Sequence, residues 1–341
     1  MKVLLIGNRG GTNIGGCLER AAQALNLEVR LLESRSAMHA PLWIRRFNWW
    51  VRGRRPTWLR SFNHALLAQC RTWRPHCILA TGLAPVNRQT MRALAQAGIP
   101  TLNYLTDDPW SRTHRAKWFL RALPYYRAVF TPRRANLDQL SITGCQEVHY
   151  LPFAYDPELH YPDPPIGAVE QTRYGVDVVF VGGGDRDRVP FLTALLRTGF
   201  RVGLYGSEWD RFPETAAISS GQADPALARK ATSGAKMALC LVRRANRDGH
   251  VMRSFEIAAM GTCLLAEETQ EHHAIFGDEG QTVMYFQTIP EMVTKLQWLL
   301  EHDEERLRLA RAAHHLIVNG GNTYADRLTT MLRGRESGDV R

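Results

Sequence analysis

The sequence lacks paired cysteines and long apolar runs, and each absence excludes a class of protein. Its six cysteines are scattered without a Cys-x-x-Cys pair, so neither a disulfide framework nor a cysteine zinc site is indicated. No run of about 18 apolar residues occurs that could span a bilayer. The first residues, "MKVLLIG", end in a glycine-rich turn and predict a strand rather than a signal peptide. We therefore expect a protein of the reducing cytoplasm.

Acidic residues are also in deficit. The 33 Asp and Glu residues against 43 Lys and Arg residues give a net charge of +10, which favours anionic partners. In residues 41–62, six arginines and four tryptophans occur without an acid. Such a segment suits the anionic inner face of a membrane, single-stranded nucleic acid, or a solvated loop whose tryptophans pack inward. We expect peripheral membrane contact through residues 41–62, and no nucleic acid partner.

Short apolar runs alternate with helical patterns along the chain. Strands are predicted at 2–7, 28–33, 76–82, 101–105, 128–131, 148–152, 177–182, 201–206, 236–242, 262–267 and 282–286. Helical patterns include 16–26, 87–98, 188–198, 224–233, 251–260, 289–301, 303–317 and 323–334. The alternation predicts an α/β fold of two Rossmann-like, doubly wound parallel-sheet domains that face a cleft.

A proline-rich stretch separates the two halves of this pattern. Residues 1–155 are the predicted first domain, residues 156–175 the linker and residues 176–320 the second domain. Residues 321–341 are predicted to form a last helix, which can cross back to the first domain, and a flexible tail.

One glycine-rich turn follows the first strand of each predicted domain. In "VFVGGGDRDR", Gly182, Gly183 and Gly184 would let a phosphate approach the backbone, and Arg186 and Arg188 add positive charge. A plain tight turn is the alternative. The third glycine of GxGxxG and the Gly-Lys-Ser/Thr of a P-loop are both absent. Asp185 and Asp187 form an Asp-x-Asp that could hold a metal ion, but the adjacent arginines would repel it.

The first domain offers candidates at the same edge of its sheet. Gly10 and Gly11 lie in the turn "IGNRGGTNIGG", and Glu33 at the end of the second strand is either a ribose ligand or an ordinary strand-end acid. "NYLTDDPW" ends a strand with two carboxylates. Asp108 before Pro109 is predicted to cap a helix, whereas Asp107 can face the cleft.

The stretch "DGHVMRSFEIAAMGTCLLAEET" joins polar residues to an apolar helix. Arg253 and Glu256 lie three residues apart on one helical face, with Asp248 at the helix entrance. A carboxylate pair suits sugar hydroxyls, and Arg253 can neutralise phosphate. A simple surface ion pair is the alternative interpretation.

These motifs resemble those of a known family. Two Rossmann-like domains with a proline-rich connection resemble the GT-B glycosyltransferase fold. "DGHVMRSFEIAAMGTCLLAEE" is similar to the donor-site segment of group-1 (family 4-like) glycosyltransferases, in which two acids stand eight positions apart. Asp248 stands where the first acid, usually Glu, is found, and Glu256 matches the second. "FEIAAMGTCLLAEE", "EHHAIFGDEGQTVMYF" and "TDDPW" are similar to the CgeB-like spore-maturation branch of that family.

The resemblance implies transfer of a sugar from a nucleotide-diphosphate sugar, usually with retention and without a required metal or other cofactor. It implies that Glu256 binds the ribose and that Asp248 lies by the sugar hydroxyls. It also implies that the glycine-rich turn of the second domain, Gly182 to Gly184, holds the diphosphate. The full donor-binding set is Gly182, Gly183, Gly184, Arg186, Arg188, Gly206 and Glu256. The expected catalytic group is Asp107, Asp248 and Arg253.

The acceptor, a glycan, lipid-linked glycan, protein or metabolite, would lie near Gly10, Gly11 and Asp108 in the first domain. A nucleotide-sugar epimerase or hydrolase on the same fold and a non-catalytic nucleotide-binding module are the alternatives. An NAD enzyme is disfavoured because GxGxxG is missing after both leading strands.

Overall fold

The computed structural model describes residues 1–333, apart from the side chain of Trp49, and divides them into two compact units. The first unit contains Met1–Pro152, the short segment Ala245–Asp248 and the helix from Tyr324 onward. The second contains Phe153–Arg244 and Gly249–Thr323. Residues 334–341, where we expected a flexible tail, lie outside the described residues.

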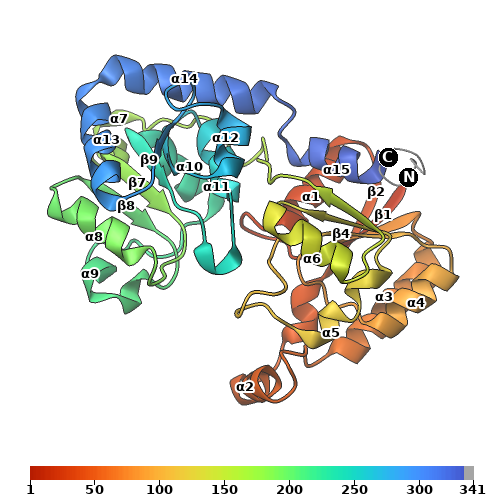
Figure 1. Cartoon of the computed structure of the whole chain (residues 1–341). Helices are drawn as coiled ribbons and strands as arrows, with labels where there is room; N and C mark the ends of the chain where they lie inside the picture. Colours follow the sequence, from red (N-terminus) through yellow and green to blue (C-terminus); the bar gives the residue numbers. More distant parts are fainter. Residues whose placement is uncertain (334–341) are drawn as a thin grey trace. The chain divides into compact units, whose positions relative to one another are not determined.

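The first unit is built on six parallel strands in the order β2-β1-β3-β4-β5-β6 (Figure 1). Their bounds are β1 Lys2–Gly7, β2 Glu28–Glu33, β3 Cys77–Thr81, β4 Thr101–Tyr104, β5 Ala128–Thr131 and β6 Glu147–Tyr150. In the interior strand β1, Leu4 pairs with Arg30 on one side and with Ile78 on the other. Buried, nearly continuous apolar strands of this kind require helices on both faces of the sheet.

The helices of the first unit supply those two layers. They are α1 Ile14–Ala24, η1 Ser34–Met38, α2 Leu42–Trp50, α3 Leu59–Trp73, α4 Arg88–Gln96, α5 Lys117–Leu120, η2 Leu123–Tyr125, η3 Arg134–Asn136, α6 Leu137–Ile142 and α15 Tyr324–Arg333. Leu66, Met91 and Phe119 pack with Ile78 of β3 in one buried apolar cluster. Helix α15 comes from the far end of the sequence and packs on α1 (Figure 1).

The second unit is built on five parallel strands in the order β11-β10-β9-β7-β8. Their bounds are β7 Val178–Val181, β8 Val202–Tyr205, β9 Met237–Cys240, β10 Cys263–Glu267 and β11 Met284–Phe286. In both sheets the second strand lies on one side of the first, and the later strands lie on the other side. The order therefore reverses between β1 and β3 and between β7 and β9. Ligands of such sheets bind at the carboxyl ends of the strands beside the reversal.

The helices of the second unit include three that the sequence pattern did not indicate, namely α7, α9 and α12. They are α7 Gly167–Tyr174, α8 Val189–Arg197, η4 Trp209–Arg211, α9 Pro213–Ala216, α10 Pro225–Gly234, α11 Met252–Ala259, α12 Gln270–Phe276, α13 Ile289–Glu301 and α14 Asp303–Asn319. The short turn η5 Arg244–Asn246 leads into the segment that belongs to the first unit. Helix α7 lies inside the stretch expected to be a linker and packs on α10. All eleven predicted strands form, which confirms the parallel α/β class for both units.

All six cysteines lie within the described residues, where they are buried and form no disulfide bond. Burial raises the pKa of the Cys240 thiol to about 12, so this side chain is a neutral core residue. Among the helices that the structure describes, none combines the length and apolar content that a bilayer-crossing segment needs.

Candidate functional site

The glycine-rich turn after β7 lies at the reversal point of the second sheet. The N–H of Gly182 donates to the carbonyl of Tyr205, and the N–H of Gly184 donates to the carbonyl of Ser207, both at 2.8 Å. Two of the three amides predicted to cradle a diphosphate are therefore engaged within the unit. Side chains around the turn must supply most of the positive charge for that role.

Gly206→Ala is expected to destabilise the second unit by about 2–4 kcal/mol. A Cβ on Gly206 would lie 1.9 Å from the carbonyl oxygen of Gly182, and its φ of 145° is rarely adopted by L side chains. Urea unfolding measures the effect. Gly199→Ala is the matched control, because Gly199 also has a positive φ, 82°, but a Cβ there meets nothing within 4 Å. Equal stability of the two variants would contradict the close packing of the two turns.

Three arginines lie close to the turn in different ways. Arg188 is buried, and it donates to the carbonyls of Gly183 at 3.0 Å and Leu241 at 3.2 Å, which fixes the turn to the chain leaving β9. Arg186 is exposed on the same loop. Arg243, which the sequence analysis did not select, is also exposed, and its Nη2 lies 3.7 Å from the place of a Cβ on Gly183. Arg186 and Arg243 thus leave guanidinium groups accessible at this edge of the sheet.

Helix α11 contributes a fourth arginine. The Nε of Arg253 donates to the carbonyl of Val181, the last residue of β7, at 3.1 Å, and its Nη1 contacts the Oε2 of Glu256. Glu256 has no exposed surface, and its Oε1 lies 3.5 Å from the Nε2 of His160. The Nδ1 of His160 accepts the N–H of Asp156, so the proton of the neutral imidazole sits on Nε2 and faces Glu256. Glu256 therefore holds Arg253 at the end of β7.

Asp248, the acid at the entrance of α11, binds a different arginine. Asp248 belongs to the segment Ala245–Asp248 of the first unit, and its Oδ1 accepts from the Nε of Arg133 at 2.5 Å. Both side chains are buried, with 2% of Arg133 and 5% of Asp248 exposed. Asn246 Nδ2 donates to the same carboxylate at 3.0 Å. Asp248 and Glu256, expected to act as a pair, thus have separate guanidinium partners.

The residues that follow Asp248 explain the rest of the motif. A Cβ on Gly249 would lie 2.4 Å from the carboxyl carbon of Glu271, so a larger residue there would displace that side chain. His250 is fully buried; its Nε2 accepts the N–H of Phe153 at 3.1 Å, and its Nδ1 therefore donates to Glu271 Oε2 at 2.6 Å. This pair fixes the entrance of α11 to α12.

Lowering the pH from 7 to 5 is expected to destabilise the second unit by about 2 kcal/mol through His272. Its Nδ1 donates to the carbonyl of Glu267 at 2.7 Å, and its Nε2 accepts from the hydroxyl of Ser254 at 2.8 Å. Burial lowers the pKa of His272 to about 4, with His250 adding to the effect and Glu271 opposing it.

The sign follows from the depressed pKa, because the unfolded chain takes up the proton first. The contribution of His272 is complete above about pH 6.5 and is lost as the pH falls towards 4. Urea unfolding at several pH values measures the slope. His272→Gln should show a shallower slope between pH 7 and 5, and an unchanged slope would contradict the assignment.

The candidates of the first unit lie in loops at the carboxyl ends of β1 and β4. Gly10 and Gly11 have φ values of 80° and 54°, and a Cβ on Gly10 would meet nothing within 4 Å. The carboxylate of Glu33 accepts the N–H of Arg9 at 3.1 Å, so it supports this turn. Asp107 is partly exposed, and its Oδ1 lies 3.9 Å from the Nε2 of His114. Asp107 is thus an accessible carboxylate at the sheet edge.

The prediction that Asp108 caps a helix is wrong. Residues 109–114 form turns and a bend, and α5 begins only at Lys117. Asp108 is fully buried and its Oδ1 accepts the N–H of Trp110 at 3.0 Å. Arg247 donates to both carboxylate oxygens, at 2.6 Å and 3.0 Å. Asp108 therefore binds the segment Ala245–Asp248 rather than a helix N-terminus.

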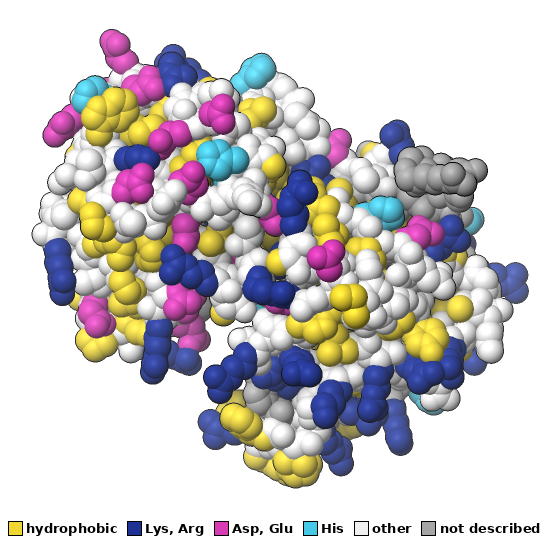
Figure 2. All heavy atoms as spheres, in the orientation of Figure 1, with side chains coloured by type: hydrophobic (Ala, Val, Ile, Leu, Met, Phe, Trp, Pro, Cys, Tyr) yellow, Lys and Arg dark blue, Asp and Glu magenta, His cyan; other side chains and the backbone are white. Residues whose placement is uncertain are grey.

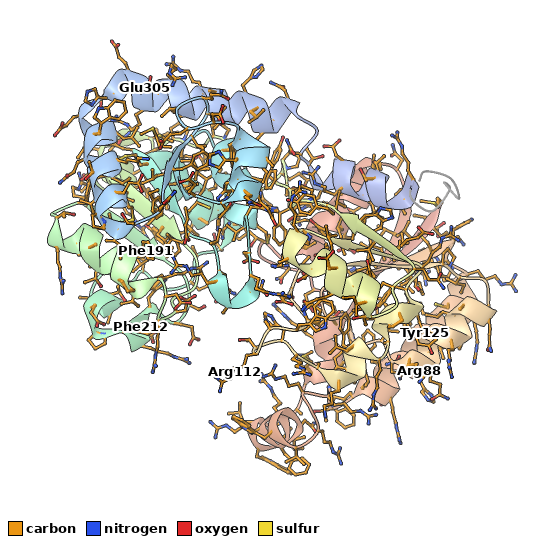
Figure 3. All side chains as sticks on the ribbon, viewed as in Figure 1. Arg88, Arg112, Tyr125, Phe191, Phe212 and Glu305 are labelled. Carbon is orange, nitrogen blue, oxygen red and sulfur yellow. The ribbon has the colours of Figure 1, made fainter. Side chains whose placement is uncertain are left out.

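Two acidic features do not extend the candidate site. Asp185 Oδ1 accepts the N–H groups of Asp187 and Arg188, so it closes the turn into α8. Within residues 1–333, no group of three His, Cys, Asp or Glu side chains is arranged to hold a metal ion. An open pocket where α13 meets α14 is lined mainly by carboxylates, including Glu305 (Figure 3), and would repel a diphosphate.

Sequence reasoning missed Arg133, His160 and Arg243. Arg133 and His160 are far in sequence from their partners Asp248 and Glu256, and only the fold brings them together. Arg243 had a local signal, because "LVRR" follows a predicted strand beside the reversal point of the sheet.

Comparisons with known proteins agree with this arrangement. Residues 186–333 match the family model described as "Glycosyl transferase-like". Sucrose-phosphate synthase from Thermosynechococcus elongatus is 14% identical, with a TM-score of 0.69 over 99% of this chain and 100% of that one. HepE from Anabaena, in complex with UDP-glucose, is 12% identical, with a TM-score of 0.66 over 99% and 100%. No curated protein matches the sequence.

A third structure, alpha,alpha-trehalose 6-phosphate synthase from Burkholderia multivorans, is 12% identical, with a TM-score of 0.63 over 98% of this chain and 96% of that one. At these identities the likeness shows the fold. The chain has two parallel-sheet α/β units of the GT-B type, as the motif resemblance implied. The family match covers Arg186, Arg253 and Glu256 but begins after the glycine turn.

Proposed function

We propose that the chain is a glycosyltransferase that transfers a sugar from a nucleoside-diphosphate sugar. The observation that carries the proposal is the concentration of guanidinium groups around a glycine-rich turn at the reversal point of the second sheet. Arg243 lies beside Gly183, and Arg253 is bound to the last carbonyl of β7 and to Glu256. The complex of HepE with UDP-glucose makes a UDP-sugar the first donor to test.

The chemistry explains why cations belong at this place. In the transfer step the bond between the sugar's anomeric carbon and the diphosphate oxygen breaks, and an acceptor oxygen forms a new bond to that carbon. Negative charge develops on the leaving diphosphate. Fixed cations at this position stabilise the transition state more than the ground state, and loss of one such donor costs about 3–4 kcal/mol.

The finer assignments are hypotheses that rest on particular features. Arginines can neutralise the leaving group, so we propose transfer without a resident metal. Retention, a hexosyl donor and the CgeB-like branch rest on the motif resemblance alone. Asp107 is our candidate for the acceptor-side base because its carboxylate is accessible. Asp248 remains the candidate for contact with the donor sugar, and to act there it would have to exchange its contact with Arg133.

The test is ligand binding followed by product analysis. We expect a thermal shift with UDP, and with at least one UDP-, GDP- or TDP-sugar, that Arg253→Gln abolishes. Arg311→Gln, an exposed arginine change on α14, is the matched control and should leave the shift intact. Absence of a shift with every nucleotide would contradict the proposal. Products with a candidate acceptor then separate transfer from epimerisation or hydrolysis, which need no acceptor.

A further inference from the structure

Helix α2 of the first unit turns its apolar side outward. Trp43 is 73% exposed and Trp50 is 80% exposed. Among the side chains of residues 42–51 that the structure describes, the exposed apolar ones are Leu42, Trp43, Phe47, Trp50 and Val51. Among the α2 side chains that the structure describes, the buried one is polar: Asn48 is 5% exposed, and its Nδ2 donates to the Oγ1 of Thr57 at 2.9 Å. A surface helix of a globular unit normally buries its apolar stripe and exposes its polar one.

The exposed apolar residues share one side of the helix. At about 100° per residue, Leu42, Trp50, Trp43 and Phe47 fall within an arc of about 140°, which also contains the exposed Arg46, whereas Asn48 lies on the opposite side. Space-filling Figure 2 shows hydrophobic side chains gathered over α2, bordered by Lys and Arg. Packing inside the first unit does not explain this side, so it is available to a partner.

The charge around α2 has one sign. Between Glu33 and Asp107 the sequence contains no acidic residue, but it contains eleven arginines. Arg45, Arg46 and Arg52 are exposed on or directly after α2. A partner of this surface must therefore offer an apolar region to the exposed side of α2 and negative charge to the arginines around it.

A second loop adds to the same basic surface. Arg54 Nη1 donates to the carbonyl of Arg115 at 3.3 Å, and its Nη2 donates to that of Arg112 at 2.5 Å. Trp118 Nε1 donates back to the carbonyl of Arg54 at 3.1 Å. These bonds tie the loop around Arg112, labelled in Figure 3, to the chain that follows α2. Arg112 and Arg115 are exposed, so their charges join those of α2.

We propose that α2 docks the first unit onto an anionic lipid bilayer, with Leu42, Trp43, Phe47 and Trp50 inserted at headgroup depth. Tryptophan favours that depth because its ring is apolar and its N–H is polar. The surrounding arginines meet lipid phosphates, and each contributes about fivefold to binding near an anionic surface. The proposal is independent of the donor chemistry of the second unit.

Other partners fit the surface less well. Single-stranded nucleic acid stacks its bases on aromatic rings, and Leu42 and Val51 have no such ring. A second copy of the chain would bring the same positive charge against itself, which costs binding energy unless it is neutralised. A bilayer satisfies the aliphatic, indole and guanidinium groups together.

Vesicle co-sedimentation of the full chain tests the proposal. We expect binding to vesicles of three parts phosphatidylcholine to one part phosphatidylglycerol to be about tenfold or more above binding to phosphatidylcholine alone. The double variant Trp43→Ser, Trp50→Ser should weaken it about tenfold, as should Arg45→Gln with Arg46→Gln. Trp298→Ser on α13 and Arg311→Gln on α14 are exposed controls that should bind like the parent chain.

Several results would overturn the proposal. One is failure of the parent chain to bind the anionic vesicles. Another is equal vesicle binding by the Trp43, Trp50 variant and the parent. A third is self-association in sedimentation velocity that the tryptophan changes abolish, without vesicle binding. Displacement from vesicles by sodium chloride but not by a single-stranded oligonucleotide at equal phosphate concentration would support the lipid assignment.

Discussion

Glu256→Gln is expected to lower the kcat/KM of sugar transfer at least about 100-fold while the protein stays folded. Glu256 is completely buried, so in this structure it acts as a positioning residue rather than as a ligand of the sugar nucleotide. Its carboxylate neutralises Arg253, whose Nε is bound to the carbonyl at the end of β7. Glutamine keeps the size of the side chain but removes the charge, which releases the guanidinium from its fixed position.

A double-mutant cycle separates this role from direct contact with the donor. If Glu256 acts through Arg253, the double variant Glu256→Gln, Arg253→Gln should lose no more activity than Arg253→Gln alone. UDP affinity should fall in both single variants. A direct ribose ligand would instead give additive losses.

Glu271→Gln is the matched control for Glu256→Gln, because Glu271 is a second buried acid, and its Oε2 is paired with the Nδ1 of His250 at 2.6 Å. It should reduce thermal stability but leave kcat/KM within about threefold at a temperature where the variant is folded. Near-parent transfer by a folded Glu256→Gln protein would refute the role assigned to this carboxylate.

The strands could be predicted because their signal is local. "KVLLIG" and "DVVFVG" are short apolar runs that end in glycine, and each forms a buried strand within one residue of the predicted bounds. The five prolines that precede α7 between residues 152 and 165 obscured its helical pattern, and α2 was obscured by an apolar side that faces away from the core. Periodicity predicts helices from the side that is buried, so a helix with the opposite arrangement escapes it.

The contacts of the candidate site could be predicted only between residues that are close in sequence. Arg253 and Glu256 are three residues apart, and their contact was expected from helical geometry. Asp108 before Pro109 has the residue types that start a helix. Its carboxylate is instead held by the bidentate contact with Arg247, 139 positions away, and no helix begins there. The partners of such buried acids cannot be predicted locally, because each acid needs a cation that only long-range packing supplies.

Arg133→Met is expected to destabilise the first unit by about 3–5 kcal/mol, because it leaves the buried carboxylate of Asp248 without its cation. The Nε of Arg133 also donates to the carbonyl of Asn246 at 3.1 Å, so one side chain holds the segment Ala245–Asp248 at two points. Urea unfolding followed by the fluorescence of a tryptophan in the first unit, such as Trp118, measures the change.

A matched surface pair provides the control for this prediction. Arg127 of the first unit lies 3.6 Å from Glu147, with 42% and 35% of the two side chains exposed, and Arg127→Met should cost no more than about 1 kcal/mol. Since the charge of Asp248 is what Arg133 neutralises, the double variant Arg133→Met, Asp248→Asn should recover part of the loss. A cost for Arg133→Met no larger than that for Arg127→Met would show that the buried pair does not anchor this segment. Asp248 would then be available for the donor-side role that the motif resemblance gives it.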